Sequence, residues 1–234
     1  MKHLNQFITE YIIKNKLDKP IDSEDHYEYS PETKEELIKV IQILLDKGET
    51  DLNCIDTSKI TDMSELFYNK EDINIDVSKW NVSNVKDMNR MFYNCEDFNC
   101  DLSNWDVSKV ENMERMFHYC EKFNCDLSNW NVSKVKNMSY MFYSCKNFDC
   151  DLSNWDVSNV EKIDHMFCEC KIFIGKGLDN WNINKKVVDM SNMFDGCRKF
   201  NCDLSKWNTK RVKDMRYMFY NCDSLKNKPN WYKA

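Results

Sequence analysis

The chain has 234 residues, of which 13% are aromatic and only four are glycine and three are proline. This composition excludes a collagen-like or low-complexity chain and predicts an ordered, globular protein. The formal net charge of −6 argues against direct binding to nucleic acid or to an anionic membrane, because both need concentrated lysine and arginine.

Residues 1–50 do not repeat, and we expect them to form an N-terminal helical cap of two helices. Apolar residues recur every three or four positions from Leu4 to Leu17, which predicts one amphipathic helix. Pro31, at a first helical position, and Gly48, at a C-terminal cap, predict a second helix between them. The cap is acidic, because it holds seven lysines against eleven Asp and Glu residues.

From residue 51 onward the sequence repeats with a period of 25 residues. The repeat divides into seven coils, 51–75, 76–100, 101–125, 126–150, 151–175, 176–202 and 203–227, followed by a closing segment 228–234. A repeat unit of this length cannot bury its own apolar face, so neighbouring coils must stack. The residues expected in the core of the stack are Trp80, Trp105, Trp130, Trp155, Trp181, Trp207, Phe92, Phe117 and Phe142.

Two apolar patterns follow each other from the end of the second coil through the third. Cys100 and Leu102 belong to an alternating pattern that is typical of a strand, whereas Val110, Met113 and Met116 recur at the spacing of a helix. We therefore expect a strand and a short helix in every coil. The predicted fold class is an α/β solenoid, leucine-rich-repeat-like, whose open end is covered by the N-terminal helices.

The recurring pattern MFxxCxxFNxDLSxWxVSxVxxM, with the opening IDTSKITDMSELF, covers roughly residues 51–227. It resembles the BspA-like bacterial surface repeat family, which is usually grouped with the leucine-rich repeats. The resemblance implies a solenoid and, as for the exported members, adhesion or contact with a host. It also implies that the tryptophans and the Met-Phe pairs, such as Met116-Phe117, belong to the core.

Twelve cysteines raise the question of disulfides or a metal site. Six occupy one position of the repeat and four another, so stacking places each thiol beneath its copy. We expect buried, reduced cysteines and neither a metal nor a cofactor. The alternative is a metal-binding or reactive-thiol cluster in HMFCEC, made by His165, Cys168 and Cys170.

The recurring Asp-x-Ser pattern, as in Asp101 and Ser103, is a candidate row of catalytic carboxylates. A catalytic pair needs two different environments, however, and stacked copies share one, so a turn is the better interpretation. The sequence contains no Ser-His-Asp set, phosphate-binding glycine-rich loop or dinucleotide motif. It therefore predicts no enzyme and no catalytic or cofactor-binding residue.

Positions that vary between coils are candidates for partner binding, because the repeat leaves them free. Two adjacent positions change in summed charge from −2 to +2 along the chain. These pairs, the charge column, are Glu71-Asp72, Glu96-Asp97, Glu121-Lys122, Lys146-Asn147, Lys171-Ile172 and Arg198-Lys199. Such a gradient orients a charged partner. The alternative is accidental order among solvated loop charges.

A second variable position follows the Met-Phe pair and carries Tyr93, His118 and Tyr143, with Arg115 and Tyr140 beside it. Tyrosine and arginine are enriched at binding hot spots, which makes these residues candidate partner contacts. Packing of the same rings between neighbouring coils is the alternative.

We predict a non-enzymatic protein–protein interaction module that binds a protein partner through an extended surface. A narrower hypothesis is a phage-encoded intracellular inhibitor, whose acidic end occupies the basic channel of a nucleic-acid enzyme. The alternatives are an exported surface adhesin and a metal- or redox-active cysteine protein. No signal peptide or transmembrane segment is seen, which predicts a cytoplasmic protein, with the extracellular surface as the alternative if an export signal has been removed.

Overall fold

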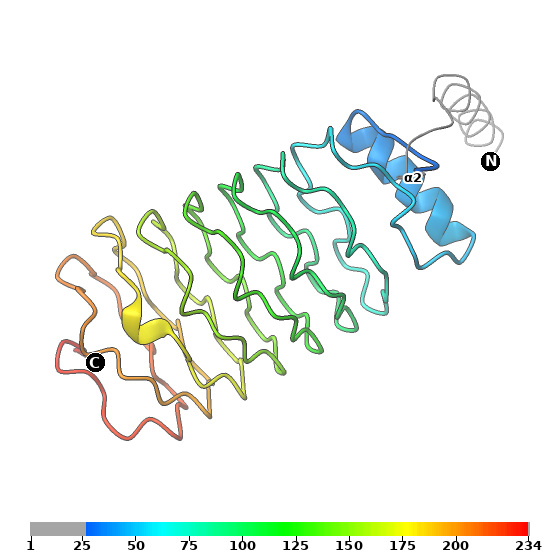
Figure 1. Ribbon diagram of the computed structural model, residues 1–234. Helices are drawn as coiled ribbons and strands as arrows, with labels where there is room; N and C mark the ends of the chain where they lie inside the picture. The colour runs from blue at the N-terminus through cyan, green and yellow to red at the C-terminus, as the bar shows by residue number, and fades with distance from the viewer. Residues whose placement is uncertain (1–26, 234) are drawn as a thin grey trace.

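The computed structural model describes residues 27–233, which form an elongated stack of coils with a helix at one end (Figure 1). The helix is α2, Lys34–Asp46, the second of the two expected helices. The first expected helix lies outside the described residues. Contrary to the prediction, Pro31 is not the first helical residue, because Thr33 caps α2: its Oγ1 accepts a hydrogen bond from the Glu36 N–H at 3.2 Å.

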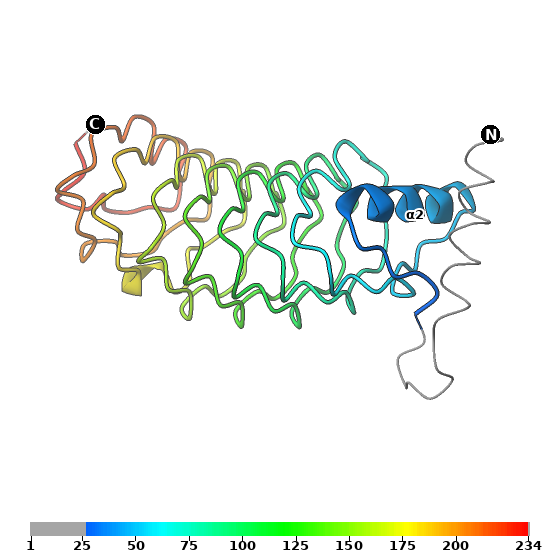
Figure 2. The ribbon, with the colours of Figure 1, turned by 90° about the horizontal axis from the view of Figure 1, so that it is seen from above.

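The apolar face of α2 covers the first coil (Figure 2). Lys34 fastens the start of the helix to that coil, with its Nζ 3.0 Å from Asp62 Oδ1. The side chains that α2 buries are Leu37, Val40, Ile41, Ile43 and Leu44. Since most of these belong to the same apolar cluster as the coils, the helix closes one end of a continuous core.

The expected strand and helix in every coil are absent from the described part of the chain. The helices there are α2 and the three-residue 3-10 helix η1, Leu178–Asn180, and the pairing between coils consists of isolated parallel bridges. The predicted α/β, leucine-rich-repeat-like class is therefore wrong. The coils are built from consecutive turns instead.

The segment expected to be helical uses its N–H groups in two different ways. In the third coil the Met116 N–H closes a tight turn onto Met113 O at 3.2 Å. The N–H groups of Met113 and Phe117 point out of the coil and donate to Asn137 O and Met141 O of the next coil, both at 2.9 Å. A helix would direct these bonds back along its own chain. Here they join the coils to one another.

Two residues of this segment, Arg115 and Tyr119, have φ angles of 54° and 60°, in the left-handed region. A residue with a side chain costs about 1–2 kcal/mol there and ends a right-handed helical path. Successive tight turns thus produce the three- and four-residue apolar spacing that predicted a helix. The corresponding residues with positive φ are Glu65, Asn69, Arg90, Asn94, Tyr140, Ser144, His165, Glu169, Asn192, Gly196, Tyr217 and Asn221.

The segment expected to be a strand uses side chains as hydrogen-bond acceptors. The Asn124 N–H donates to Asn99 Oδ1 at 2.9 Å, and the Asp149 N–H donates to Asn124 Oδ1 at 3.0 Å. Each side-chain oxygen takes the place of a backbone carbonyl, so a continuous ladder between strands does not form.

Columns of identical side chains fill the interior of the stack. The Phe117 and Phe142 rings, for example, stack with centroids 5.6 Å apart. Trp130 donates from Nε1 to Leu102 O of the preceding coil at 3.0 Å, which satisfies its buried N–H. The expected core residues that are buried are Trp80, Trp105, Trp130, Trp155, Trp181, Trp207, Phe92, Phe117 and Phe142.

Candidate interaction surface

The charge column is a spatial column, because backbone hydrogen bonds hold its first four pairs in register. The Asp97 N–H donates to Glu71 O at 3.1 Å, and the Lys122 N–H donates to Glu96 O at 3.1 Å. The Asn147 N–H donates to Glu121 O at 3.3 Å, and beyond the last pair the Ser224 N–H of the seventh coil donates to Arg198 O at 3.0 Å. The order of charges along the sequence is therefore also their order along the stack.

Ion pairs neutralise the middle of the charge column. Lys122 Nζ lies 2.8 Å from Asp97 Oδ1, and Lys146 pairs with Glu121. Within residues 27–233, the first pair and the last pair of the column make no ion pair. The column is thus acidic near α2, internally balanced at its centre, and basic toward the sixth coil.

Tyr68, Tyr93, His118 and Tyr143 stack into a column of rings, the ring column, with neighbouring centroids 4.6–4.8 Å apart. Tyr68 is 43% exposed, whereas His118 is only 7% exposed and offers a partner little surface. Burial, together with the charges of Arg115 and Arg90, lowers the pKa of His118 to about 4. The His118 ring is therefore neutral at pH 7 and packs as an aromatic residue.

A second strip of predicted contacts lies beside the ring column. The Arg115 guanidinium carbon is 4.6 Å from the centroid of the Tyr140 ring, and Tyr140 stacks on His165 at 4.2 Å. The Tyr140 and Tyr143 rings are 5.9 Å apart, so the two strips touch. The predicted aromatic contacts are thus brought together, and each also packs between neighbouring coils.

All twelve cysteines lie in the described part of the chain, and none of them is paired in a disulfide. Each member of the larger column hydrogen-bonds a phenylalanine carbonyl of the preceding coil, as Cys120 Sγ does to Phe92 O at 3.0 Å. Burial raises the pKa of Cys95 to about 12 and that of Cys168, in the HMFCEC cluster, to about 12. Such thiols are protonated and unreactive at neutral pH.

The interpretation of the Asp-x-Ser pattern as a turn is confirmed. The Ser103 N–H donates to Asp101 Oδ1 at 2.9 Å, and the same bond recurs between Ser128 and Asp126. These hydrogen bonds lower the pKa of Asp101, because they stabilise its charged form. Within residues 27–233, no three His, Cys, Asp or Glu side chains converge as a metal site requires.

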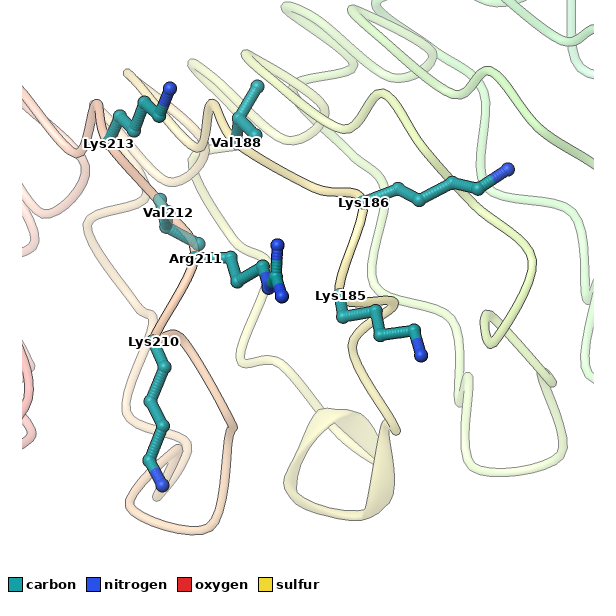
Figure 3. Close-up of a pocket in the computed structure, with 7 residues that line it drawn as sticks. All are labelled: Lys185, Lys186, Val188, Lys210, Arg211, Val212 and Lys213. Atoms are coloured by element: carbon teal, nitrogen blue, oxygen red, sulfur yellow. The ribbon is translucent and has the colours of Figure 1, made fainter.

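The sequence-based predictions missed one surface feature, a basic hollow between the sixth and seventh coils (Figure 3). Lysines, one arginine and two valines line it. The signals that could have revealed it are the basic run KWNTKRVKDMR and the 27-residue length of the sixth coil.

In the part of the chain that the structure describes, no helix combines the length and the apolar character that crossing a membrane requires. No curated protein and no solved structure matches the chain. A family described as Mycoplasma protein of unknown function, DUF285, matches residues 40–155 and 138–233, which together cover most of the chain. This family is related to the BspA-like surface repeat proteins. The chain therefore belongs to the DUF285 family of repeat proteins.

Proposed function

We propose that this protein is a non-enzymatic interaction module that binds another protein through the face carrying the charge column and the ring column. The observation that carries the proposal is the stacking of the charge pairs in register, with uncompensated acids at one end and uncompensated bases at the other. Five steps of about 4.8 Å separate the two ends by roughly 24 Å. A partner of opposite charge order is steered and oriented by such a surface.

The ring column supplies the apolar part of the proposed interface. Tyr68 is the most exposed of its rings and stacks on Tyr93 at 4.8 Å, so a partner meets a rigid aromatic surface. Rigid aromatic anchors lose little conformational entropy on binding. A non-catalytic role is also supported by the buried, protonated thiols and by the aspartates that serve as turn acceptors.

Two narrower versions of this proposed function differ in the partner that they name. In the inhibitor version, the acidic end of the column, together with the acidic residues 1–50, enters the basic channel of a nucleic-acid enzyme. In the adhesin version, which the relation of the family to BspA-like surface repeats supports, the partner lies outside the cell. Affinity purification followed by mass spectrometry identifies the partner and distinguishes the two.

Charge reversal tests the interface once a partner is in hand. We expect the double variant Glu71→Lys/Asp72→Lys to bind about tenfold more weakly at low salt, because two attractions become repulsions. The matched control is Glu35→Lys/Glu49→Lys, which makes the same change of charge at exposed residues at the two ends of α2. The control should retain the native affinity for a partner that binds the two columns alone, and it should bind more weakly if residues 1–50 also enter the partner, as in the inhibitor version. Unchanged affinity of the Glu71→Lys/Asp72→Lys variant contradicts the proposed face. Loss of affinity in the control variant alone would place the interface on α2.

A further inference from the structure

A basic hollow of about 700 Å³ lies between the sixth and seventh coils. This basic groove is lined by five cations, Lys185, Lys186, Lys210, Arg211 and Lys213. Val188 and Val212 complete the lining. Figure 3 shows the Arg211 side chain extending from the seventh coil toward the sixth near Lys185, while the side chains of Lys186, Lys210 and Lys213 point in other directions. Cations of both coils line the hollow.

A break in the register of the coils coincides with the groove. Lys136 and Glu161 are joined by a backbone hydrogen bond of 2.7 Å, one of a series that connects each coil to the next at this position. Val188 is the corresponding residue of the sixth coil, and within the described residues its N–H makes no bond to Glu161. The series resumes with the Lys213 N–H, which donates to Val188 O at 2.7 Å.

The break leaves positive charge without compensation. From the second coil to the fifth, bases and acids alternate at this position, and Lys136 Nζ pairs with Glu111 Oε2 at 2.6 Å. Val188 carries no charge at this position of the sixth coil, so Lys213 of the seventh coil follows an uncharged residue, whereas Lys136 follows Glu111. Of the five groove cations, only Lys186 makes an ion pair within residues 27–233, with Glu161 at 2.5 Å.

We propose that the basic groove binds an acidic segment of a protein partner. The carboxylates of the segment pair with the uncompensated cations, and the Arg211 guanidinium can bind one of them through two parallel hydrogen bonds. Val188, which is 47% exposed, and Val212 form an apolar wall for the side chains between the carboxylates. The volume falls within the roughly 300–1,000 Å³ of ordinary ligand sites.

The lining favours a peptide over a nucleic acid. Sites for single-stranded nucleic acid combine cations with aromatic side chains on which bases stack. No aromatic residue lines the basic groove, and two valines occupy its wall instead. Aliphatic surface between cations suits a segment in which glutamate or aspartate alternates with apolar residues.

This inference rests on the proposed function only in taking the partner to be a protein. The basic groove shares no residue with the charge column. A synthetic probe tests the groove without the natural partner, so either proposal can fail while the other stands.

The probe is a fluorescein-labelled peptide of alternating glutamate and leucine, titrated with the full chain and followed by anisotropy. A peptide with glutamine in place of glutamate and a thymidine oligonucleotide of equal charge are titrated in parallel. We expect the acidic peptide to bind and the glutamine peptide not to bind. Affinity should fall when the salt rises from about 50 mM to about 500 mM, because exposed ion pairs are screened.

Three variants locate the binding. Lys185→Glu/Arg211→Glu should weaken binding of the acidic peptide by at least about tenfold. Val188→Glu places a carboxylate among the groove cations and should weaken binding by about threefold or more. Lys109→Glu/Lys134→Glu makes the same charge change in the third and fourth coils and should leave the affinity within about twofold. Circular dichroism shows whether each variant keeps the fold.

Three results overturn the proposal. The acidic peptide fails to bind the native chain, or the matched control loses as much affinity as the groove variants, or the oligonucleotide binds more tightly than the peptide. The last result would assign the groove to nucleic acid.

Discussion

The relative stability of glycine and alanine variants at position 144 distinguishes a coil made of turns from a coil that contains a helix. Ser144 lies in the fourth coil with φ of 59°, is buried, and donates its N–H to Cys168 O at 2.7 Å. A Cβ costs about 1–2 kcal/mol in this left-handed conformation. Glycine avoids this cost but loses more conformational entropy on folding than alanine does, which offsets about 0.5–1 kcal/mol of the advantage. We expect Ser144→Gly to be more stable than Ser144→Ala by about 0.5–1 kcal/mol.

A helical segment predicts the opposite sign, because glycine in a helix interior is about 1 kcal/mol less stable than alanine. The free energy of unfolding is measured by guanidinium denaturation, followed by tryptophan fluorescence. Lys134, which is exposed in the same coil and lies outside the positive-φ set, is the matched control. There, alanine should be more stable than glycine by about 0.4–1 kcal/mol. An alanine variant at position 144 that equals or exceeds the glycine variant refutes the turn-based structure.

Two further predictions concern buried titratable groups. Because burial lowers the pKa of His118 to about 4, the unfolded chain binds a proton that the folded chain does not between about pH 6.5 and pH 4. The free energy of unfolding should therefore decrease as the pH is lowered through this window, by up to about 1.4 kcal/mol per pH unit. His118→Tyr should reduce this dependence. Equal pH dependence of the two proteins, measured by denaturation at several pH values, contradicts the assignment. Burial also raises the pKa of Cys95 to about 12, so a thiol reagent near neutral pH should leave Cys95 unmodified in the folded protein and modify all twelve cysteines in denaturant. Rapid labelling of Cys95 before unfolding would show that it is accessible.

The stacking of the core could be read from the sequence, because a side chain that recurs at a constant interval meets its own copy when the units stack. Trp130 and Phe117 illustrate this: both are buried, and each contacts the neighbouring coil through a column position chosen from spacing alone. α2 and its end before Gly48 could also be located from local signals, whereas its start lies at Lys34, three residues after the predicted Pro31. These features depend on the sequence interval between equivalent apolar residues and not on the backbone path that joins them.

The backbone path itself was mispredicted, because apolar spacing does not distinguish a helix from consecutive tight turns. The decisive information lies in the polar residues between the apolar ones. Asn69, Asn94 and Asn221 occupy left-handed positions, which asparagine tolerates better than most residues. Asn99 and Asn124 supply side-chain acceptors where a strand would use backbone carbonyls. A row of asparagines at these positions is a signal for turns that the apolar pattern concealed.

The two proposed binding surfaces show when surface positions can be assigned from a repeat. The charge column could be predicted because adding 25 to a residue number reaches the next member, and the backbone bond from Lys122 to Glu96 confirms that this step is also a step along the stack. In the sixth coil, 27 residues replace 25, and the same addition carries Glu161 to Lys186 while the register position passes to Val188. Glu161 pairs with Lys186, an uncharged valine takes the register position, and cations of two coils line one hollow. Where the period is constant, the surface columns of a stack can be predicted from the sequence. Where the period changes, as in the sixth coil, the neighbours of a residue can only be identified from the structure.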